Sequence, residues 1–423
     1  MNTNLIYEAV YNMLIQANTK LNLEDYKKLK ECNSKIRDEI LENAYLANAS
    51  KRPLCQDTGQ VVVFLKIGQD VKLEGEYIND VINKAVKNCY KDNFYRKSVV
   101  KDGIFDRTNT NTNTPCIVHT KIIKGDEVSI LVGIKGGGAE NVTQLKMMNP
   151  TSSFEDVLAF ARKAAQDAGE NACPPMVMGI GIGGTSEVAA LNAKYALFKG
   201  KKVDTKIENV FEVKIITSQT HIACLPVCIN LNCHSIRHSE CVIKDNKIEY
   251  KFKDYDVSEY KVQKNARKIN TYNIEEFKNL KTNDEILLSG KIYTARDMAH
   301  KKLISMIENN EELPIELKNS IIFYAGPCPK TPDEVIGPIG PTTSKRMDKF
   351  APILYEKGVL ATIGKGNRTI KNTGYLYFKA AGGVANVYKN CVKKAKLVAF
   401  EDFGTEAIYE LEVVDMPLVA EII

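Results

Sequence analysis

The sequence lacks several features that would place it in a familiar class. No apolar run reaches the about 18 residues that a membrane-spanning helix needs, so we expect no membrane span. The GxxxxGK(S/T) spacing of a phosphate-binding P-loop is missing, and no two cysteines have the CxxC spacing of a ferredoxin-type cluster. No internal repeat or low-complexity segment is visible. Tryptophan is also absent, which by itself excludes nothing.

An excess of charge of one sign is lacking too. The formal net charge of +6 is small for 423 residues and is not gathered in blocks, so it does not indicate a nucleic-acid partner. It mildly favours an anionic small molecule. The hydrophobic fraction of 44% and the charged fraction of 26% are ordinary for a globular protein, and the length suffices for two or three domains.

Cysteine, by contrast, is plentiful. The chain has 11 cysteines and no recognisable secretory signal, because residues 1–17 have the apolar periodicity of an amphipathic helix. We therefore expect a cytoplasmic protein with reduced thiols. In that compartment clustered cysteines indicate metal binding or catalysis rather than disulfides.

Hydrophobic periodicity predicts an α/β protein in which strands alternate with short helices. A lysine-rich stretch over residues 242–269 would form a hairpin and a solvated connector, with a domain boundary near residue 270. We expect helices over residues 1–17, 25–46, 75–95, 154–168 and 187–198. We expect strands over residues 61–65, 117–123, 128–134, 176–182, 227–231, 285–289, 320–325, 360–363, 375–378 and 397–400, the second and third of them forming a pair joined by residues 124–127.

The stretch Lys51–Gln60, KRPLCQDTGQ, combines four kinds of functional group. A thiol, an amide, a carboxylate and a hydroxyl follow one another at Cys55, Gln56, Asp57 and Thr58. A proline precedes them and a glycine follows, which predicts a loop before the buried strand 61–65. Functional groups at a strand end are well placed for chemistry. Taken alone, however, the stretch is better explained as a surface turn with a buried cysteine.

Two glycine-rich segments could bring backbone N–H groups close to an anion. KGGGAEN, residues 135–141, has three consecutive glycines. Residues 183–186 join a predicted strand to a predicted helix, and a turn of this kind binds anions well. The GxGxxG-like spacing of Gly179, Gly181 and Gly184 is on its own weak support for a dinucleotide site.

Three widely spaced cysteines lie at predicted loop or strand ends beside polar residues, namely Cys55, Cys173 and Cys233. Three isolated thiolates suit an iron–sulfur cluster in which one iron lacks a protein ligand. Such an iron is a Lewis acid that can hold a hydroxyl or a carboxylate. This is the chemistry of a non-redox iron–sulfur lyase.

Nine segments along nearly the whole chain extend this pattern: PLCQDTG (53–59), KGGGAEN (135–141), ACPP with GIGIGGTSE (172–187), HIACLPVCINLNC (221–233), LSGKIYTARDMAHK (288–301), GPTTSKRMD (340–348), IGKGNR (363–368), AGGVA (381–385) and EDFGTEAIYELEVVDMPL (401–418). In this order they resemble the class I, iron–sulfur-dependent fumarate hydratases and the related L-tartrate dehydratases. The shared order is far more specific than any single motif. In many relatives the two parts are separate α and β subunits, whereas here they are fused.

The resemblance implies a [4Fe-4S] cluster whose ligands are Cys55, Cys173 and Cys233. It implies a cluster-binding α+β domain over residues 1–270 and a swivelling β/β/α-type domain over residues 271–423, with the substrate between them. It also implies a homodimer acting on a small dicarboxylate, fumarate or malate, in the tricarboxylic acid cycle.

The resemblance also assigns roles at the substrate site. Thr342 matches the proposed catalytic base, although a free threonine hydroxyl is far too weakly acidic to act as an alkoxide near neutral pH. Lys365 or Arg346 would have to lower its pKa, and Asp57 could instead relay the proton or orient the water. His221 matches an active-site histidine. Arginine forks recognise carboxylates bidentately, and the substrate-binding positions are Gln56, Arg96, Gly137, Arg296 and Arg346.

Alternatives stay open on the residues alone. The substrate could be L-tartrate, giving oxaloacetate, or a methylated dicarboxylate. A non-catalytic zinc or redox-sensing protein is a third interpretation, with its ligands taken from Cys224, Cys228, Cys233, Cys241, His221 and His234. We expect His119 to be structural, and His234 and His238 to be solvated or to support metal ligands. The other cysteines would be buried apolar thiols, namely Cys32, Cys89, Cys116, Cys328 and Cys391.

Overall fold

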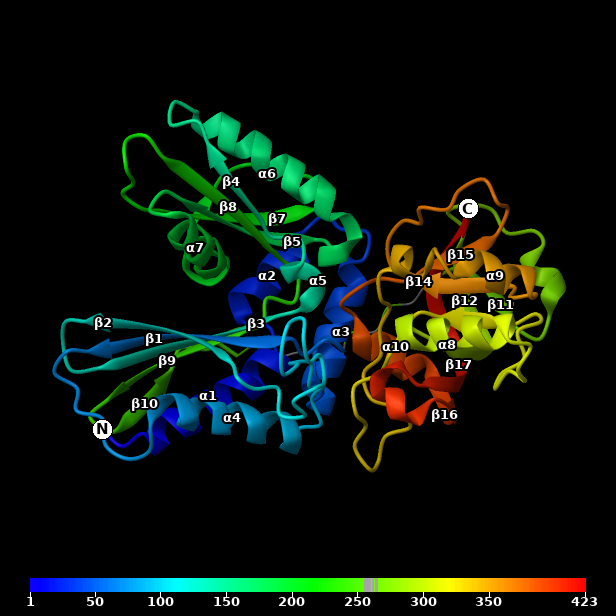
Figure 1. The fold of residues 1–423 in the computed structure, drawn as a ribbon, viewed down its shortest axis with the longest axis horizontal. Coiled ribbons are helices and arrows are strands. Elements are labelled where there is room, and N and C mark those ends of the chain that lie inside the picture. Colours follow the sequence, from blue (N-terminus) through cyan, green and yellow to red (C-terminus); the bar gives the residue numbers. More distant parts are fainter. Residues whose placement is uncertain (255–259, 261, 263–264) are drawn as a thin grey trace. The chain divides into compact units, whose positions relative to one another are not determined.

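The computed structural model describes residues 1–254, 260, 262 and 265–423. The chain divides into two compact units, Met1–Tyr260 and Lys261–Ile423, called unit 1 and unit 2 below. The described residues form three β-sheets, two in unit 1 and one in unit 2 (Figure 1). The predicted α/β class is therefore confirmed at the level of a mixed fold.

Unit 1 interleaves helices and strands along the chain. Its helices are α1 (Asn4–Thr19), α2 (Leu23–Glu31), α3 (Arg37–Ser50), α4 (Ile78–Asp92), α5 (Gly137–Glu140), α6 (Phe154–Ala168) and α7 (Ser186–Lys199). Its strands are β1 (Gln60–Gly68), β2 (Ile117–Ile123), β3 (Val128–Lys135), β4 (Gln144–Met148), β5 (Met176–Ile182), β6 (Lys201–Val203), β7 (Val210–Thr217), β8 (Leu225–Asn232), β9 (His238–Lys244) and β10 (Lys247–Tyr250).

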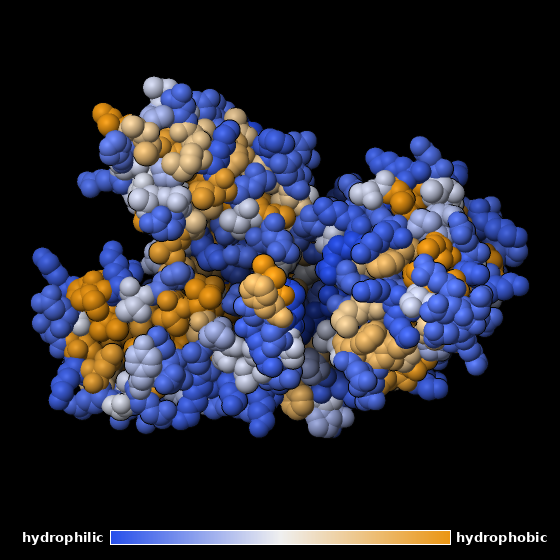
Figure 2. Space-filling view, in the orientation of Figure 1, coloured by the Kyte–Doolittle hydropathy of each residue, from blue (hydrophilic) through white to orange (hydrophobic). Residues whose placement is uncertain are grey.

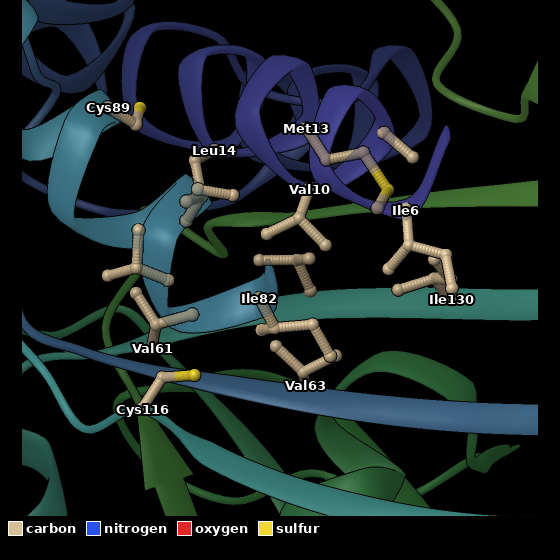
Figure 3. Packing of buried hydrophobic residues seen from close by; sticks show 14 of the residues in the cluster. Ile6, Val10, Met13, Leu14, Val61, Val63, Ile82, Cys89, Cys116 and Ile130 are labelled. Carbon is tan, nitrogen blue, oxygen red and sulfur yellow. The ribbon is translucent and has the colours of Figure 1, made fainter. Parts of the chain in front are cut away.

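The first sheet of unit 1 has the strand order β10-β9-β3-β1-β2, and helices α1 and α4 cover one of its faces. Figure 3 shows apolar side chains of α1, such as Val10 and Leu14, facing Val61 and Val63 of β1. Val62 and its neighbours on the other face of β1 pack against α7. Because β1 is covered on both faces, its apolar run is continuous instead of alternating.

The second sheet of unit 1 has the strand order β4-β8-β5-β7-β6. Helix α6 starts with a capping box, in which the side chains of Ser153 and Asp156 accept each other's backbone N–H. The predicted helix over residues 154–168 and the predicted strand over residues 176–182 are confirmed as α6 and β5. Antiparallel β5 and β8 form the middle of this sheet, so their ends fix where the following loops meet.

Unit 2 is built on one seven-stranded sheet, β11-β12-β13-β14-β15-β17-β16, in which β12 also pairs with β17. Five of its strands, β12 to β15 and β17, therefore form a closed ring. The strands are β11 (Arg267–Asn270), β12 (Glu285–Thr294), β13 (Ile321–Phe323), β14 (Ala361–Gly364), β15 (Leu376–Lys379), β16 (Val392–Ala399) and β17 (Ile408–Ile422). The helices are α8 (Asp297–Glu308), α9 (Ala351–Glu356) and α10 (Ala385–Cys391).

Two expectations about local structure were wrong, and one strand was missed. The strands over residues 117–123 and 128–134 do not pair with each other, because β1 lies between them as the centre of the sheet. Strand β2 carries polar residues that suit an edge, whereas the apolar β1 suits the middle. The helix expected over residues 25–46 is interrupted between α2 and α3, where Asn33 and Ser34 favour a turn. The long strand β17 was not predicted.

The surface seen in Figure 2 is mostly hydrophilic, with hydrophobic residues gathered in patches. Large apolar side chains exposed on edge strands include Ile122 of β2 and Met147 of β4. Within the described part of the chain, no helix combines the length and the apolar character needed to cross a membrane.

Candidate functional site

Cys55 lies in the loop between α3 and β1, and this loop is hydrogen-bonded to the glycine-rich segment after β3. The Asp57 carboxylate accepts hydrogen bonds from the backbone N–H of Gly59 at 3.1 Å and of Gly137 at 2.8 Å. Strands β1 and β3 are antiparallel with Gln60 opposite Lys135, so the loops at this end of the pair meet. The first two motifs of the sequence therefore form one site.

Gly59 is required where these two loops touch. Its φ of +61° is in the left-handed region that side chains other than glycine rarely adopt. A Cβ atom at this position would lie only 2.4 Å from the carbonyl oxygen of Lys135. Any larger residue would thus push the Cys55 loop away from the glycine-rich segment.

Cys173 and Cys233 lie at one end of the second sheet. Cys173 precedes β5 and Cys233 follows β8, and Val177 pairs with Asn232 where these antiparallel strands meet. The Nδ1 atom of His234 lies 3.3 Å from the carbonyl oxygen of Cys173, and His234 is buried. Of the two alternatives expected for His234, solvation is therefore excluded, and the contact agrees with the other, a supporting role beside candidate ligands.

Of the three predicted cluster ligands, Cys55 interacts electrostatically with both of the others. Burial raises the pKa of the Cys55 thiol to about 12, and negative charge on Cys233, Asp57 and Cys173 raises it as well. The Arg237 guanidinium has the opposite effect and lowers this pKa. A thiolate here is therefore unfavourable unless a positive group binds it.

Arg237 was not singled out from the sequence, yet it is the cation of this site. It is 1% exposed, and its Nη1 donates a hydrogen bond of 2.6 Å to the backbone carbonyl of Asp57. Its Nε has no hydrogen-bond partner. Within the described ranges no carboxylate forms an ion pair with it. The only sequence signal was an arginine four positions after Cys233, within a loop of histidine and serine.

Gln56 and Arg96 belong to the same part of unit 1. The Cys55 thiol donates to Gln56 Oε1 at 3.5 Å. The Thr58 hydroxyl donates to the backbone carbonyl of Arg96 at 2.6 Å. The loop over residues 96–115, predicted to be irregular, is thus tied at its start to the Cys55 loop.

His221 does not join this site within its own chain. It precedes β8, whereas Cys233 follows it, and eight residues of extended strand span roughly 26 Å. His221 is exposed and lies in a separate cavity of about 520 Å³ at the other end of the sheet. That cavity is also lined by Gly184, Thr185, Glu187 and Cys224.

A zinc site at the second cysteine group is contradicted. Among residues 1–254, 260, 262 and 265–423, no three histidine, cysteine or carboxylate side chains are placed to hold a single metal ion. Cys224 and Cys233 lie at opposite ends of β8, and Cys241 is buried in the core under α1. The finding concerns single ions, because ligands of a polynuclear cluster bind different metal atoms and lie farther apart.

Unit 2 brings Thr342, Arg346 and Lys365 together. The backbone N–H of Lys365 donates to the Thr342 carbonyl at 3.0 Å, and Arg346 Nη1 donates to the Thr342 hydroxyl at 3.4 Å. The same guanidinium holds the Asp297 carboxylate with two bonds, Nε to Oδ1 at 3.1 Å and Nη2 to Oδ2 at 2.6 Å. Asp297 was missed in the sequence, although it lies within a quoted motif.

Arg296 lies at the start of α8, directly before Asp297. Its Nη2 is 3.3 Å from Glu406 Oε1, and its carbonyl is 2.8 Å from Nδ1 of the buried His300. Both predicted substrate arginines of unit 2 therefore have a carboxylate partner inside their own unit. An incoming carboxylate would have to share or replace these partners.

Comparison with known proteins agrees with this two-part organisation. The family model described as fumarate hydratase (Fumerase) matches residues 3–210, and that of the fumarase C-terminus matches residues 241–422. The "Fumarate hydratase 1, mitochondrial" of Leishmania major is 27% identical over 442 residues, covering 90% of this chain and 79% of the relative. The "Fumarate hydratase class I, anaerobic" of Escherichia coli K12 is 27% identical over 436 residues, with the same two coverages.

A third relative matches unit 2 alone. The "Putative L(+)-tartrate dehydratase subunit beta" of Methanocaldococcus jannaschii is 42% identical over 150 residues, covering 33% of this chain and 77% of the relative. The two-unit fold and the two family matches together define a lyase in which the N-terminal and C-terminal parts lie in one chain. The chain belongs to the class I fumarate hydratase family and is a hydro-lyase of that family.

Proposed function

We propose that this hydro-lyase adds water reversibly to fumarate, giving (S)-malate. Fumarate hydratases are similar to the chain over 90% of its length. Relatives named for L-tartrate match shorter parts of it, so the comparison favours fumarate as the substrate. The observation that carries the proposal is that hydrogen bonds tie the segment of Cys233 to the other two cysteine-bearing segments, through Arg237 to the Asp57 carbonyl and through His234 to the Cys173 carbonyl.

A [4Fe-4S] cluster held by Cys55, Cys173 and Cys233 belongs to the same proposal. The donor set suits it, because Cys55 and Cys233 are buried, Cys173 is partly exposed, and the described residues do not form the shell of a single ion. The buried guanidinium of Arg237 supports it too, because its Nε has no hydrogen-bond partner and no carboxylate in the described ranges lies within ion-pair distance, so further negative charge beside it would be favourable. When bound, the open iron would supply a Lewis acid that makes a hydroxyl a better leaving group.

The residues of unit 1 would bind and orient the substrate beside the cluster. Gln56 can donate its amide to a carboxylate, and Arg96 can bind one with two bonds. The N–H of Gly137 is already used by Asp57, at 2.8 Å, so Gly137 would act by holding Asp57 in place. Asp57 would then orient the attacking water.

Unit 2 would supply the base and further cations. In the direction from malate, Thr342 would take the proton from C3, and Arg346 would lower the pKa of its hydroxyl through the 3.4 Å contact. Lys365, whose backbone is bonded to Thr342, would add positive charge. Arg296 would bind a carboxylate of the substrate. His221 has no step in this scheme, because it lies at the far end of β8.

Three further features complete the proposal. Unit 2 would be of the swivelling β/β/α type, which its closed ring of strands supports. The active form would be a homodimer. A reducing, cytoplasmic compartment is supported by the thiols, since all eleven cysteines lie in the described ranges and none of them forms a disulfide there.

The test is an assay of the protein after anaerobic reconstitution with iron and sulfide. We expect fumarate to be consumed, followed by the loss of its ultraviolet absorbance. L-tartrate is the second candidate, because the relative named for it has the higher identity over unit 2. Oxaloacetate formed from L-tartrate at a higher kcat/KM than malate from fumarate would overturn the choice of substrate.

The role of Thr342 is tested in the same assay. Thr342→Ala should lower kcat at least about a hundredfold, because general base catalysis is worth about 10²–10⁴ in rate. The cluster absorbance and the binding of malate should be retained. Thr343→Ala is the matched control and should keep most of the activity. Turnover by Thr342→Ala within a factor of about three of wild type would assign the base elsewhere.

A further inference from the structure

The geometry points to a role for Arg237 that no motif or relative assigns: it is the internal countercharge of the three-cysteine site and the positioning residue of the Cys55–Asp57 loop. The inference rests on the proposed function only in that it takes the cysteines to bind a metal cluster. It concerns a residue that does not touch the substrate.

The first observation is an unbalanced charge. Arg237 is one of the largest fully buried side chains of the protein, at 1% exposure. Its charge is felt by Cys55, Cys233, Asp57 and the buried Tyr90, all of which would be stabilised as anions by it. A guanidinium in this position is costly unless its neighbours carry negative charge. The Asp57 carboxylate provides part of that charge, and cysteine thiolates bound to iron would provide more.

The second observation is a comparison with the neighbouring buried cation. Lys135 is 3% exposed and also faces Cys233, but Glu140 lies 3.7 Å from its Nζ and balances it. Lys194 in turn holds Glu140 at 2.5 Å. Lys135 therefore has a carboxylate within ion-pair distance, which it shares with Lys194. Arg237 has no carboxylate within ion-pair distance in the described ranges, so the anionic groups that it faces are the more distant Asp57 carboxylate and the cysteines Cys55 and Cys233.

The third observation is positional. Arg237 Nη1 donates to the carbonyl of Asp57 at 2.6 Å, while the Asp57 carboxylate accepts from Gly137 at 2.8 Å. A Cβ atom on Gly136 would lie 3.5 Å from Arg237 Nη2 and 3.1 Å from Asp57 Oδ2. The absence of a side chain at Gly136 therefore lets its backbone pack against both the guanidinium and the carboxylate. One guanidinium thus fixes the backbone between a thiol and a carboxylate.

A countercharge at this distance has a definite electrostatic consequence. A nearby cation favours the more negative, reduced form of a cluster and so raises its reduction potential. It also favours the thiolate over the thiol and so strengthens the retention of iron. Removing the positive charge should lower the potential and loosen the iron, even though Arg237 is not a ligand.

The experiment compares Arg237→Met and Arg237→Lys with the full-length wild type, all reconstituted anaerobically. Iron per chain and the midpoint potential from an electron paramagnetic resonance titration are measured. Arg237→Met should have a more negative potential and lose iron at least several times faster to a chelator. Arg237→Lys restores the charge and should recover most of both properties. Arg162→Met, which removes an exposed arginine on α6, is the control and should behave as wild type.

The outcomes separate this inference from the proposed function. A wild-type potential and wild-type iron retention in Arg237→Met would overturn the countercharge, while fumarate hydration by the wild type would still stand. If Arg237→Met takes up no cluster, iron retained by Arg237→Lys supports the inference, and equal loss in both variants overturns it. If the wild type holds a cluster but does not hydrate fumarate, the choice of fumarate as substrate is refuted. The inference about Arg237 can still be tested, because the reduction potentials of the wild type and the Arg237 variants can be compared.

Discussion

Two cysteines that look alike in sequence have different surroundings in the structure. Cys55 and Cys116 each come shortly before a strand of the first sheet, and each is buried. Cys116 packs among apolar side chains (Figure 3), and burial raises the pKa of its thiol to about 11. Cys55 interacts with two other thiols, a carboxylate and an arginine. Burial alone therefore does not distinguish a structural thiol from a candidate ligand.

This contrast gives the first prediction. Cys55→Ser should lose most of the iron bound after anaerobic reconstitution and essentially all hydratase activity, because one of the three thiolates is missing. Cys116→Ser should bind iron as the wild type does, with at most a modest loss of stability. Iron per chain and visible absorbance measure both. Equal iron contents in the two variants would remove Cys55 from the ligand set.

His300 illustrates a buried group whose role is structural. It is fully buried, and burial lowers its pKa to about 4, while the carbonyl of Arg296 partly offsets this effect. A histidine in an unfolded chain titrates near about 6.5. Below that pH the unfolded chain gains a proton that the folded protein does not take up. The free energy of unfolding should therefore fall as the pH drops from about 6.5 to about 4.

The second prediction follows from that sign. The contribution of His300 should amount to roughly 3 kcal/mol across this range, as an upper limit. Urea unfolding of the metal-free protein by circular dichroism, at pH 8 and pH 4.5, measures it. His300→Gln should be less sensitive to acid than the wild type, whereas His221→Gln, at an exposed position, should keep the wild-type dependence. The same acid sensitivity in His300→Gln would contradict the assignment.

At the scale of elements, the register of two strands decides which loops meet. Residues 53–59 and 135–141 are distant in sequence, but the pairing of Gln60 with Lys135 brings them together. The antiparallel pairing of β5 with β8 does the same for Cys173 and Cys233. His221 and Cys233 lie far apart because the extended strand β8 runs between them.

The third prediction tests the contact between these loops. Gly59→Ala should destabilise the fold by about 1–3 kcal/mol and reduce iron uptake, because a Cβ atom would strain the backbone and meet the Lys135 carbonyl at 2.4 Å. Gly103→Ala is the control, since nothing lies within 4 Å of its would-be Cβ atom. Denaturant unfolding and iron content are the measurements. Wild-type values for Gly59→Ala would mean that the two loops do not need this close approach.

Strand pairing was also where the sequence misled. Residues 117–123 and 128–134 have the pattern and the short connection of a hairpin, yet β1 lies between them. Both strands gain more by pairing with the apolar β1 than with each other, since that arrangement covers β1 on both edges. Periodicity identified the strands, but it carries no information on which partner each strand takes.

At the scale of the whole molecule, each unit has its own hydrophobic core. Leu14 of α1 belongs to the core of the first sheet, and Leu303 of α8 belongs to the core of unit 2. Both side chains are fully buried. Since the two cores share no residue, a cavity made in one core should destabilise mainly the unit that contains it.

The fourth prediction uses this separation. Leu303→Ala and Leu14→Ala should each destabilise their own unit by about 2–5 kcal/mol, the usual effect of such cavities. Hydrogen exchange followed by mass spectrometry should show faster exchange over residues 265–423 for the first variant and over residues 1–254 for the second. Uniformly faster exchange along the whole chain in either variant would mean that the units unfold as one.

The sequence by itself determined the family, the two-part order of the motifs, the strongly periodic elements such as α6 and β5, and the residue types available for chemistry. These follow from local composition and periodicity, which record whether a segment is buried and in what form. Only the tertiary structure decided that hydrogen bonds tie the segment of Cys233 to those of Cys55 and Cys173, that β1 separates β2 from β3, that Arg237 is buried beside the Cys55 loop and that His221 lies at the other end of β8. Strand register and burial are set by contacts between residues far apart in the chain, and no local pattern encodes them.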